Sequence, residues 1–503
     1  MTLLKRNIVA NFLGQGWAAL MSFIFIPLYI KFLGIEAYGL IGFFAMMQAM
    51  LQVLDLGISQ TMNREMARYA VFPEKAAEAR DLVRTLEIGY WIIGMTIGIV
   101  VAVASPFIAK HWIKAGSLPS STVQQSVAIM GLVVALQWPI SLYGGGLLGL
   151  QRQILFNVVK IGISTIGSCG SILILWLVSP TITAFFKWQI IVSAIFVSVI
   201  TILLRRSLPH AERVARFNFG MLHSIWRFAA GMSGIALSAI ILTQADKLIL
   251  SKILSLEMFG YYALAGAVSN AIPTMLAGPV FIGLFPRFSS LVALKDDAAL
   301  TLLYHQGTQL MAVLVLPVAA VLSFFSHDIL LLWTGSPKTA ETASPIVSIL
   351  VIGMALNALM TLPYALQLSH GWTSIGLRIN TFLIIMLVPA IYYMSTHYGA
   401  VGAASVWIVL NGLYMLIGVP LTHRRLLRSE MLPWFAEDVI PPLGAALLAV
   451  GLGRWLIAGP MTSLTSIASI FIVLFAALLM AVMAAPHIRT WLVLQLKTRI
   501  IHV

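Results

Sequence analysis

Four basic residues interrupt long apolar stretches of the sequence. Arg64 and Arg287 stand near the ends of the second and eighth stretches, and Lys160 and Arg378 near the starts of the fifth and eleventh. Arginine binds phosphate oxygens bidentately, and lysine binds them as a point charge. If these stretches line one cavity, the four cations would form a ring suited to a diphosphate. The alternative is that they are ordinary basic residues at helix ends, which reach the lipid headgroups.

A second group of charges comprises Asp55 and the adjacent pair Asp246 and Lys247. A carboxylate inside a membrane span is costly, so Asp55 predicts a hydrogen-bond partner or a water-filled cavity. Asp55 or Asp246 could then carry a coupling ion, either H⁺ or Na⁺. The competing interpretations are a structural helix–helix hydrogen bond for Asp55 and an interfacial position for Lys247, and both stay open.

Composition identifies the elements that must position these residues. The chain has 503 residues, of which 60% are hydrophobic and 10% charged, whereas soluble domains average about 45–50% and about 25%. This excludes a soluble enzyme, and the single cysteine, Cys169, excludes a disulfide scaffold. At about 20 residues per crossing, we expect an all-α polytopic membrane protein with about 14 transmembrane helices. The predicted spans are 8–30, 39–60, 86–109, 123–147, 154–178, 183–204, 226–250, 258–282, 306–326, 344–367, 377–395, 399–421, 439–457 and 463–485.

The distribution of basic residues predicts the orientation. Of the 31 Lys and Arg residues, 23 fall on one side of the predicted spans and 8 on the other. Because cytoplasmic loops carry the excess of Lys and Arg, both termini are expected in the cytoplasm. The connection 63–87 holds ten charged residues and predicts a solvated cytoplasmic helix.

An internal repeat predicts the domain organisation. Residues 31–39 align without gaps on residues 252–260, and Lys, Leu, Glu and Gly recur at an offset of 221. Six predicted spans separate the two segments, so the repeat is parallel. We therefore expect two six-helix lobes related by a pseudo-twofold axis along the membrane normal, with the substrate path between them. The predicted domains are an N-lobe at 1–221, a C-lobe at 222–430, and two further helices with a cytoplasmic tail at 431–503.

Known catalytic and cofactor motifs do not explain this chain. The glycines in 144–149 match a dinucleotide-binding pattern only formally, because no strand precedes them, and the expected role is close helix packing or a flexible helix end. The sequence holds no Gly-Lys-Ser/Thr phosphate loop and no paired-His motif, so we expect no enzyme activity, cofactor or metal. Pro273 and Pro279 crowd the eighth span and predict a hinge.

Several short motifs, in this order, resemble the polysaccharide-transporter branch of the MOP superfamily, which contains the Wzx-type flippases. The motifs are Asn11 to Gly16, Leu33 to Gly39, Asp55-Leu-Gly57 followed by Asn63-Arg64, Gly149 to Arg152 with Asn157, Asp246 to Leu250, Leu332 to Gly335, and Gln367 to Thr373. The resemblance covers residues 1–425, and the last two helices match only in number and hydropathy.

The resemblance implies a protein of the bacterial inner membrane that flips undecaprenyl-diphosphate-linked oligosaccharides by alternating access. It supports Arg64, Arg287 and the Asp246–Lys247 pair as cavity residues, whereas Lys160 and Arg378 rest mainly on the repeat. The implied partners are the polyprenyl-diphosphate-linked glycan, the bilayer and polysaccharide polymerase or assembly proteins. No nucleic acid partner is expected, since the net charge of +14 follows mainly from the orientation.

Two alternatives remain beside this interpretation. An ion-coupled multidrug or organic-cation exporter of the same superfamily needs acidic cavity residues, but the few charges inside the spans are mostly basic. A membrane glycosyltransferase or polymerase using the same lipid carrier needs a sizeable outer loop with catalytic residues. The longest predicted outer connections, 110–122 and 327–343, are short and contain no clustered carboxylates or histidines.

Overall fold

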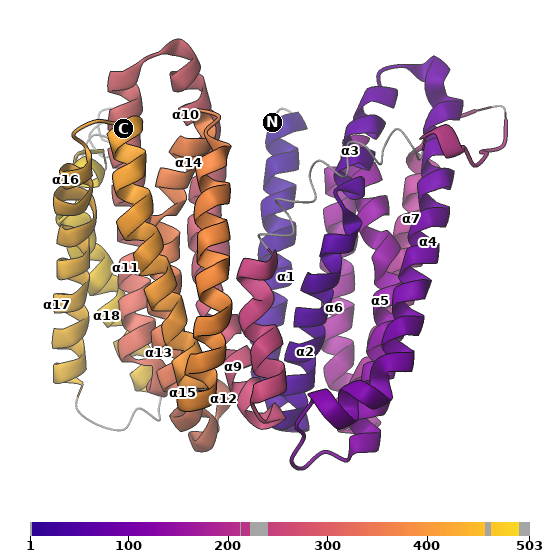
Figure 1. The fold of residues 1–503 in the computed structure, drawn as a ribbon, viewed down its shortest axis with the longest axis horizontal. Coiled ribbons are helices and arrows are strands. Elements are labelled where there is room, and N and C mark those ends of the chain that lie inside the picture. Colours follow the sequence, from indigo (N-terminus) through magenta and orange to yellow (C-terminus); the bar gives the residue numbers. More distant parts are fainter. Residues whose placement is uncertain (1–2, 212, 222–239, 458–463, 492–503) are drawn as a thin grey trace. The chain divides into compact units, whose positions relative to one another are not determined.

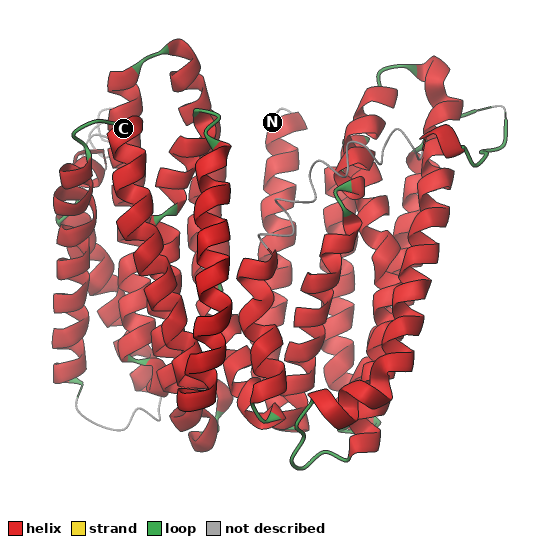
Figure 2. Ribbon diagram, viewed as in Figure 1, coloured by secondary structure: helices red, strands yellow, loops and turns green. Residues whose placement is uncertain are grey.

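The fold is an all-α polytopic membrane protein, as predicted. The computed structural model describes residues 3–211, 213–221, 240–457 and 464–491, and in these ranges helices are joined by short loops (Figure 2). Twelve helices in the described part are long and apolar enough to cross a membrane. Helices suit this environment because each satisfies its backbone hydrogen bonds within its own segment.

The predicted count of fourteen spans is not settled by these twelve. One of the twelve, Arg378–Arg425, covers two predicted spans, which meet at the non-helical Gly399 (φ 61°). The predicted span 226–250 lies largely outside the described residues, and only 240–253 are described as helical. Arg227, Lys497 and Arg499, which entered the count of basic residues, also lie outside them. Fourteen spans therefore remain a prediction.

The chain divides into two compact units, Met1–Gly260 and Tyr261–Val503. The predicted lobe boundary after residue 221 falls beside the undescribed residues 222–239, so the lobe and domain bounds remain a prediction. The elements of the first unit (Figure 1) are α1 (Leu3–Leu33), α2 (Ile35–Leu51), the 3₁₀ turn η1 (Gln52–Asp55), α3 (Ile58–Tyr69), η2 (Pro73–Lys75), α4 (Ala76–Phe107), the π-helical turn η3 (Ile108–Trp112), α5 (Ser120–Gly149), α6 (Gln153–Leu177) and α7 (Ile182–Ser207).

The second unit begins within α9 (Leu256–Ser269). Its further elements are the π-helical turn η4 (Ile272–Ala277), α10 (Gly278–Leu294), α11 (Asp297–Phe324), α12 (Ser326–Thr334), α13 (Pro337–Leu359), α14 (Thr361–Ser369), α15 (Thr373–Arg425), α16 (Met431–Pro433), the π-helical turn η5 (Trp434–Val439), α17 (Ile440–Leu456) and α18 (Leu464–Met483). The turn η4 contains Pro273, and Pro279 stands in the first turn of α10. One predicted hinge residue thus lies within a departure from α-helical geometry and the other shortly after it, and the hinge remains a prediction.

The glycines of α5 pack tightly against α3, as predicted from the sequence. A Cβ added at Gly145 would collide with the carbonyl oxygen of Ser59, and one added at Gly149 with that of Asn63. Small residues let membrane helices approach this closely. The glycine pattern therefore has a packing role, which positions α3.

The prediction of a solvated helix over 63–87 is wrong for its second half. Residues 76–87 form the start of the long helix α4, and Asp81 and Glu87 are 4% and 5% exposed. Asp81 forms an ion pair with Arg213 of the segment after α7. Glu87 pairs with Arg205 at 2.7 Å and accepts a hydrogen bond from Tyr143 at 2.7 Å. These carboxylates are buried because basic residues distant in sequence neutralise them.

Candidate functional site

The second predicted span, 39–60, is not one continuous helix. Helix α2 ends at Leu51, the turn η1 follows, and α3 begins at Ile58. Leu56 (φ 50°) and Gly57 (φ 74°) both adopt the left-handed conformation, which costs a non-glycine residue roughly 1–2 kcal/mol. Irregular backbone at membrane depth occurs where it is buried in protein or lines a cavity. The break therefore marks a candidate site.

Asp55 ends η1 and is held by three hydroxyl groups. Its Oδ2 accepts a hydrogen bond from the Ser59 hydroxyl at 2.7 Å, and the Ser59 backbone N lies 3.4 Å from the same oxygen. Its Oδ1 accepts from the Tyr90 hydroxyl at 2.5 Å and lies 3.4 Å from the hydroxyl of Ser141. The carboxylate thus has the partners that its position predicts, and its contacts with Ser59 connect the turn η1 to the first turn of α3.

A polar cavity of about 370 Å³ lies beside this carboxylate, within the first unit. Gln48 and Gln137 are hydrogen-bonded to each other, and Gln137 also donates to the Ser193 hydroxyl at 2.9 Å. The lining residues, most of them polar, are Gln48, Leu51, Gln52, Asp55, Ser59, Val134, Gln137, Trp138 and Ser141. The cavity can hold water or a small cation next to a carboxylate.

Sequence reasoning found Asp55 but missed most of this lining. Gln48 and Gln137 are amides inside predicted spans, which is a signal that could have been used. Ser59 stands four residues after Asp55, a spacing at which the two side chains meet on a helix. Tyr90 and Ser141 give no comparable signal, because their contact with Asp55 depends on tertiary packing.

In the first unit, the two predicted phosphate-binding cations have different surroundings. Arg64 on α3 is half-exposed and pairs with Glu65 at 2.7 Å, and Arg68 pairs with the same carboxylate at 3.1 Å. Lys160 on α6 is partly buried, and it forms no hydrogen bond or ion pair with any described residue. Of the two, Lys160 has its whole charge available for a ligand.

In the second unit, Arg287 on α10 and Arg378 on α15 are exposed, and neither forms an ion pair within the described part of the chain. Arg64 and Lys160 belong to one compact unit and Arg287 and Arg378 to the other. The ring would take residues from both units, and it remains a prediction.

Asp246 and Lys247 lie in the helical segment 240–253. Asp246 is 3% exposed, and the Lys247 ammonium donates to Gln244 Oε1 at 3.3 Å. Asp246 is thus a buried acid in the last part of the first unit, and its role in coupling remains a prediction.

Comparison with known proteins identifies the family of this chain. The model of a family described as "Polysaccharide biosynthesis protein" matches residues 4–292, and the MatE family model matches residues 245–394. A curated protein of Shigella flexneri, named "Putative O-antigen transporter", is 21% identical over 417 residues, which cover 82% of this chain and 96% of that protein.

Solved structures show the same fold. The structure of the lipid II flippase MurJ in an inward closed conformation matches with a TM-score of 0.68 at 12% identity, covering 95% of this chain and 98% of that chain. An inward-facing multidrug resistance MATE family transporter of the MOP superfamily matches with a TM-score of 0.66 at 16% identity, covering 86% and 100%. The predicted MOP-type fold is confirmed.

Proposed function

Because the chain belongs to the family of polysaccharide biosynthesis proteins, we propose that it is a flippase for undecaprenyl-diphosphate-linked oligosaccharide repeat units. It moves them from the cytoplasmic to the periplasmic leaflet of the bacterial inner membrane by alternating access. The similarity to a protein named as an O-antigen transporter over most of both chains supports this class of substrate.

The observation that carries the substrate proposal is the unpaired charge of Lys160. A partly buried ammonium on a membrane helix is costly without a counter-charge, and no described residue supplies one. A diphosphate would supply it and would also attract the exposed Arg287 and Arg378. Arg64 contributes less to this binding, because Glu65 already compensates it.

We assign the coupling role to Asp55. It is an acid beside a polar cavity at a break in a membrane helix, and broken helices form ion sites in many transporters. A proton or Na⁺ bound at Asp55 would neutralise it and weaken its hold on Tyr90 and Ser59. Both termini lie in the cytoplasm in this proposal, as the excess of basic residues on one side indicates.

A second candidate function is export of organic cations. The match of the MatE model to residues 245–394 favours it, and Asp55 offers a carboxylate to a cation. The two candidates differ in the charge of the transported group, so they predict opposite roles for Lys160. A lysine facing the path would repel a cation but hold a diphosphate.

The test is deletion of the gene in its own host, followed by complementation. The flippase proposal expects loss of surface polysaccharide and accumulation of lipid-linked oligosaccharide, both reversed by the wild-type chain. Lys160→Gln should fail to restore export although it inserts in the membrane, whereas Lys187→Gln, at an exposed position on α7, should restore it. Unchanged polysaccharide in the deletion strain, together with increased sensitivity to organic cations, would favour the exporter.

A further inference from the structure

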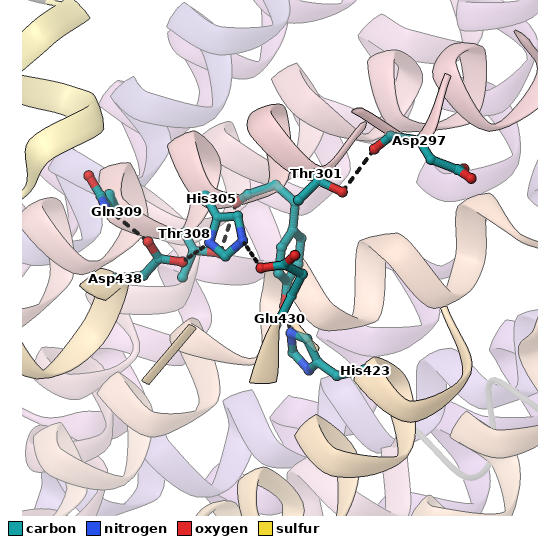
Figure 3. Close-up of polar contacts among 9 residues, drawn as sticks. Asp297, Thr301, His305, Thr308, Gln309, His423, Glu430 and Asp438 are labelled. Carbon is teal, nitrogen blue, oxygen red and sulfur yellow. Dashed lines mark hydrogen bonds and ion pairs between the residues drawn. The ribbon is translucent and has the colours of Figure 1, made fainter. Parts of the chain in front are cut away.

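A buried polar cluster in the second unit lies away from the residues discussed so far (Figure 3). At its centre is His305 on α11, whose side chain is 8% exposed. Its Nδ1 lies 2.6 Å from Oδ2 of Asp438 in the turn η5, and its Nε2 lies 3.1 Å from Oε2 of Glu430. The imidazole therefore lies between two carboxylates contributed by the segment that precedes α17.

The number of protons in this cluster follows from donor and acceptor chemistry. An ionised carboxylate only accepts hydrogen bonds, and a neutral imidazole carries one N–H. Both ring nitrogens of His305 face carboxylate oxygens at hydrogen-bond distance, so two protons are needed for the two contacts. Either the imidazole is doubly protonated or one carboxylic acid is neutral. In each case the cluster holds one proton more than a neutral histidine beside two carboxylates.

His423, a neighbouring buried histidine, shows the contrast. Its Nδ1 lies 2.8 Å from the carbonyl oxygen of Val419, and its Nε2 lies 3.3 Å from the Tyr304 hydroxyl. One N–H donated to the carbonyl and one hydroxyl donated to the ring satisfy both nitrogens of the neutral form. The requirement for an extra proton is thus specific to His305, and it does not follow from burial alone.

The same cluster joins three segments of the second unit. Gln309, one turn after His305 on α11, donates to Asp438 Oδ1 at 3.0 Å and accepts from the backbone N of His487 at 2.8 Å. The ring of His487 stacks on that of His305 with centroids 6.2 Å apart. Asp438 is fully buried, whereas the side chain of Glu430 is 29% exposed. The proton can therefore exchange with water through the carboxylate of Glu430.

We propose that His305, Asp438 and Glu430 form a proton-binding site that stabilises the packing of η5 and α17 against α11. With the proton bound, His305 bridges the two carboxylates. When it leaves through Glu430, the neutral ring keeps one N–H for two carboxylate contacts, so one of the two ionised carboxylates loses its donor. Such uncompensated charge in a buried site is costly, so η5 and α17 loosen from α11. This site is independent of the transported substrate.

The groups that face His305 define its electrostatic surroundings. They are Asp438 from η5, Glu430 from the turn before α16, Tyr304 from its own helix, His423 from α15 and His487 from the segment 486–491. The two carboxylates favour the bound proton. A charge on His423 or His487 would oppose it, and His487, which stacks on the ring, would do so most directly.

Hydrogen–deuterium exchange of the purified full-length chain tests this site. Exchange of residues 434–456, corrected for the intrinsic rate, gives the opening constant of η5 and α17. Because the closed site holds one proton more than the open site, this constant should rise by up to about tenfold per pH unit above the ordinary pKa of a histidine, about 6.5. His305→Gln and Glu430→Gln should remove this dependence, and Glu430→Gln, at the exposed rim, is the variant least disruptive to folding.

The matched control is His397→Gln, because His397 is exposed on α15 and outside the cluster. It should keep the wild-type dependence. A wild-type opening constant that does not vary with pH would overturn the proposal. So would a pH dependence that persists in His305→Gln or Glu430→Gln, or one that is also lost in His397→Gln.

Discussion

Gly39 and Gly260 contact each other reciprocally at an offset of 221 residues, the offset at which the sequence repeats. A Cβ added at Gly39 would lie 3.3 Å from the backbone N of Gly260, and one added at Gly260 would lie 3.3 Å from the N of Gly39. The Cβ added at Gly39 would also collide with the carbonyl oxygen of Leu256, and the Cβ added at Gly260 would collide with the carbonyl oxygen of Ile35. Ile35 and Leu256 occupy the same place in the repeat, so the local contact is two-fold symmetric.

This contact predicts that neither glycine tolerates a methyl group. Gly39→Ala and Gly260→Ala should each lower the stability of the purified protein by about 1–3 kcal/mol, the usual cost of overpacking. Thermal unfolding in detergent measures the change. The loss of stability in the double variant should be smaller than the sum of the losses in the two single variants, because the two residues touch. Gly266→Ala, on the same helix α9 with no atom within 4 Å of the added Cβ, should be close to neutral, and an equal loss there would contradict the account.

Asp55 should be required for ion coupling. Asp55→Asn keeps an oxygen for the Tyr90 and Ser59 hydroxyls but cannot bind a proton or Na⁺ as an anion does. Transport into vesicles with imposed H⁺ or Na⁺ gradients should depend on one gradient in the wild-type chain and lose that dependence in Asp55→Asn. The control is Tyr90→Phe, which removes one hydrogen-bond donor and keeps the charge. Full coupling in the Asn variant would remove Asp55 from this role.

The segment after α7 should be released when Asp81 loses its charge. Asp81 pairs with Arg213 and accepts a hydrogen bond from the backbone N of Arg216 at 2.7 Å, so both trypsin sites are held against α4. In Asp81→Asn, cleavage after these arginines should be faster than in the wild-type chain. Glu74→Gln, at an exposed position, serves as the control. Equal cleavage rates for Asp81→Asn and the wild-type chain would show that the ion pair does not hold the segment.

Reporter fusions should place both ends of the chain in the cytoplasm. The excess of basic residues on one side predicts that green fluorescent protein fused to either terminus fluoresces and that alkaline phosphatase fused there is inactive. Alkaline phosphatase fused after Lys338, on the side with few basic residues, should be active. Activity at either terminus would show that the number of spans is odd or that the orientation is reversed.

The sequence predicted features that depend on local pattern and composition. Apolar runs identified the membrane helices, and the glycines of 144–149 indicated close packing. The repeat aligned Gly39 with Gly260, but their contact was not predicted. Asp55 was found because a carboxylate in an apolar run is unusual. The break at Leu56 and Gly57 was not predicted, because a left-handed leucine has no sequence signal and is held by tertiary contacts.

The cluster around His305 was missed for a different reason. The predicted spans began at residues 306 and 439, immediately after His305 and Asp438, so both residues were assigned to solvated connections. Their pairing joins positions 133 residues apart, which no spacing rule reveals. Hydropathy ends a predicted span at a polar residue. It does so both when that residue is solvated and when it is buried with a partner.

The central claim is that the protein moves a lipid-linked diphosphate, and flipping in proteoliposomes tests it most directly. A polyprenyl-diphosphate oligosaccharide should cross the bilayer only in vesicles that contain the protein, and polyprenyl diphosphate without sugar should compete better than the dephosphorylated lipid. Lys160→Gln should weaken apparent binding roughly ten- to hundredfold, the loss expected for a charged hydrogen bond worth about 1.5–3 kcal/mol, while Lys187→Gln should not. Equal competition by the uncharged lipid, or wild-type transport by Lys160→Gln, would contradict the account.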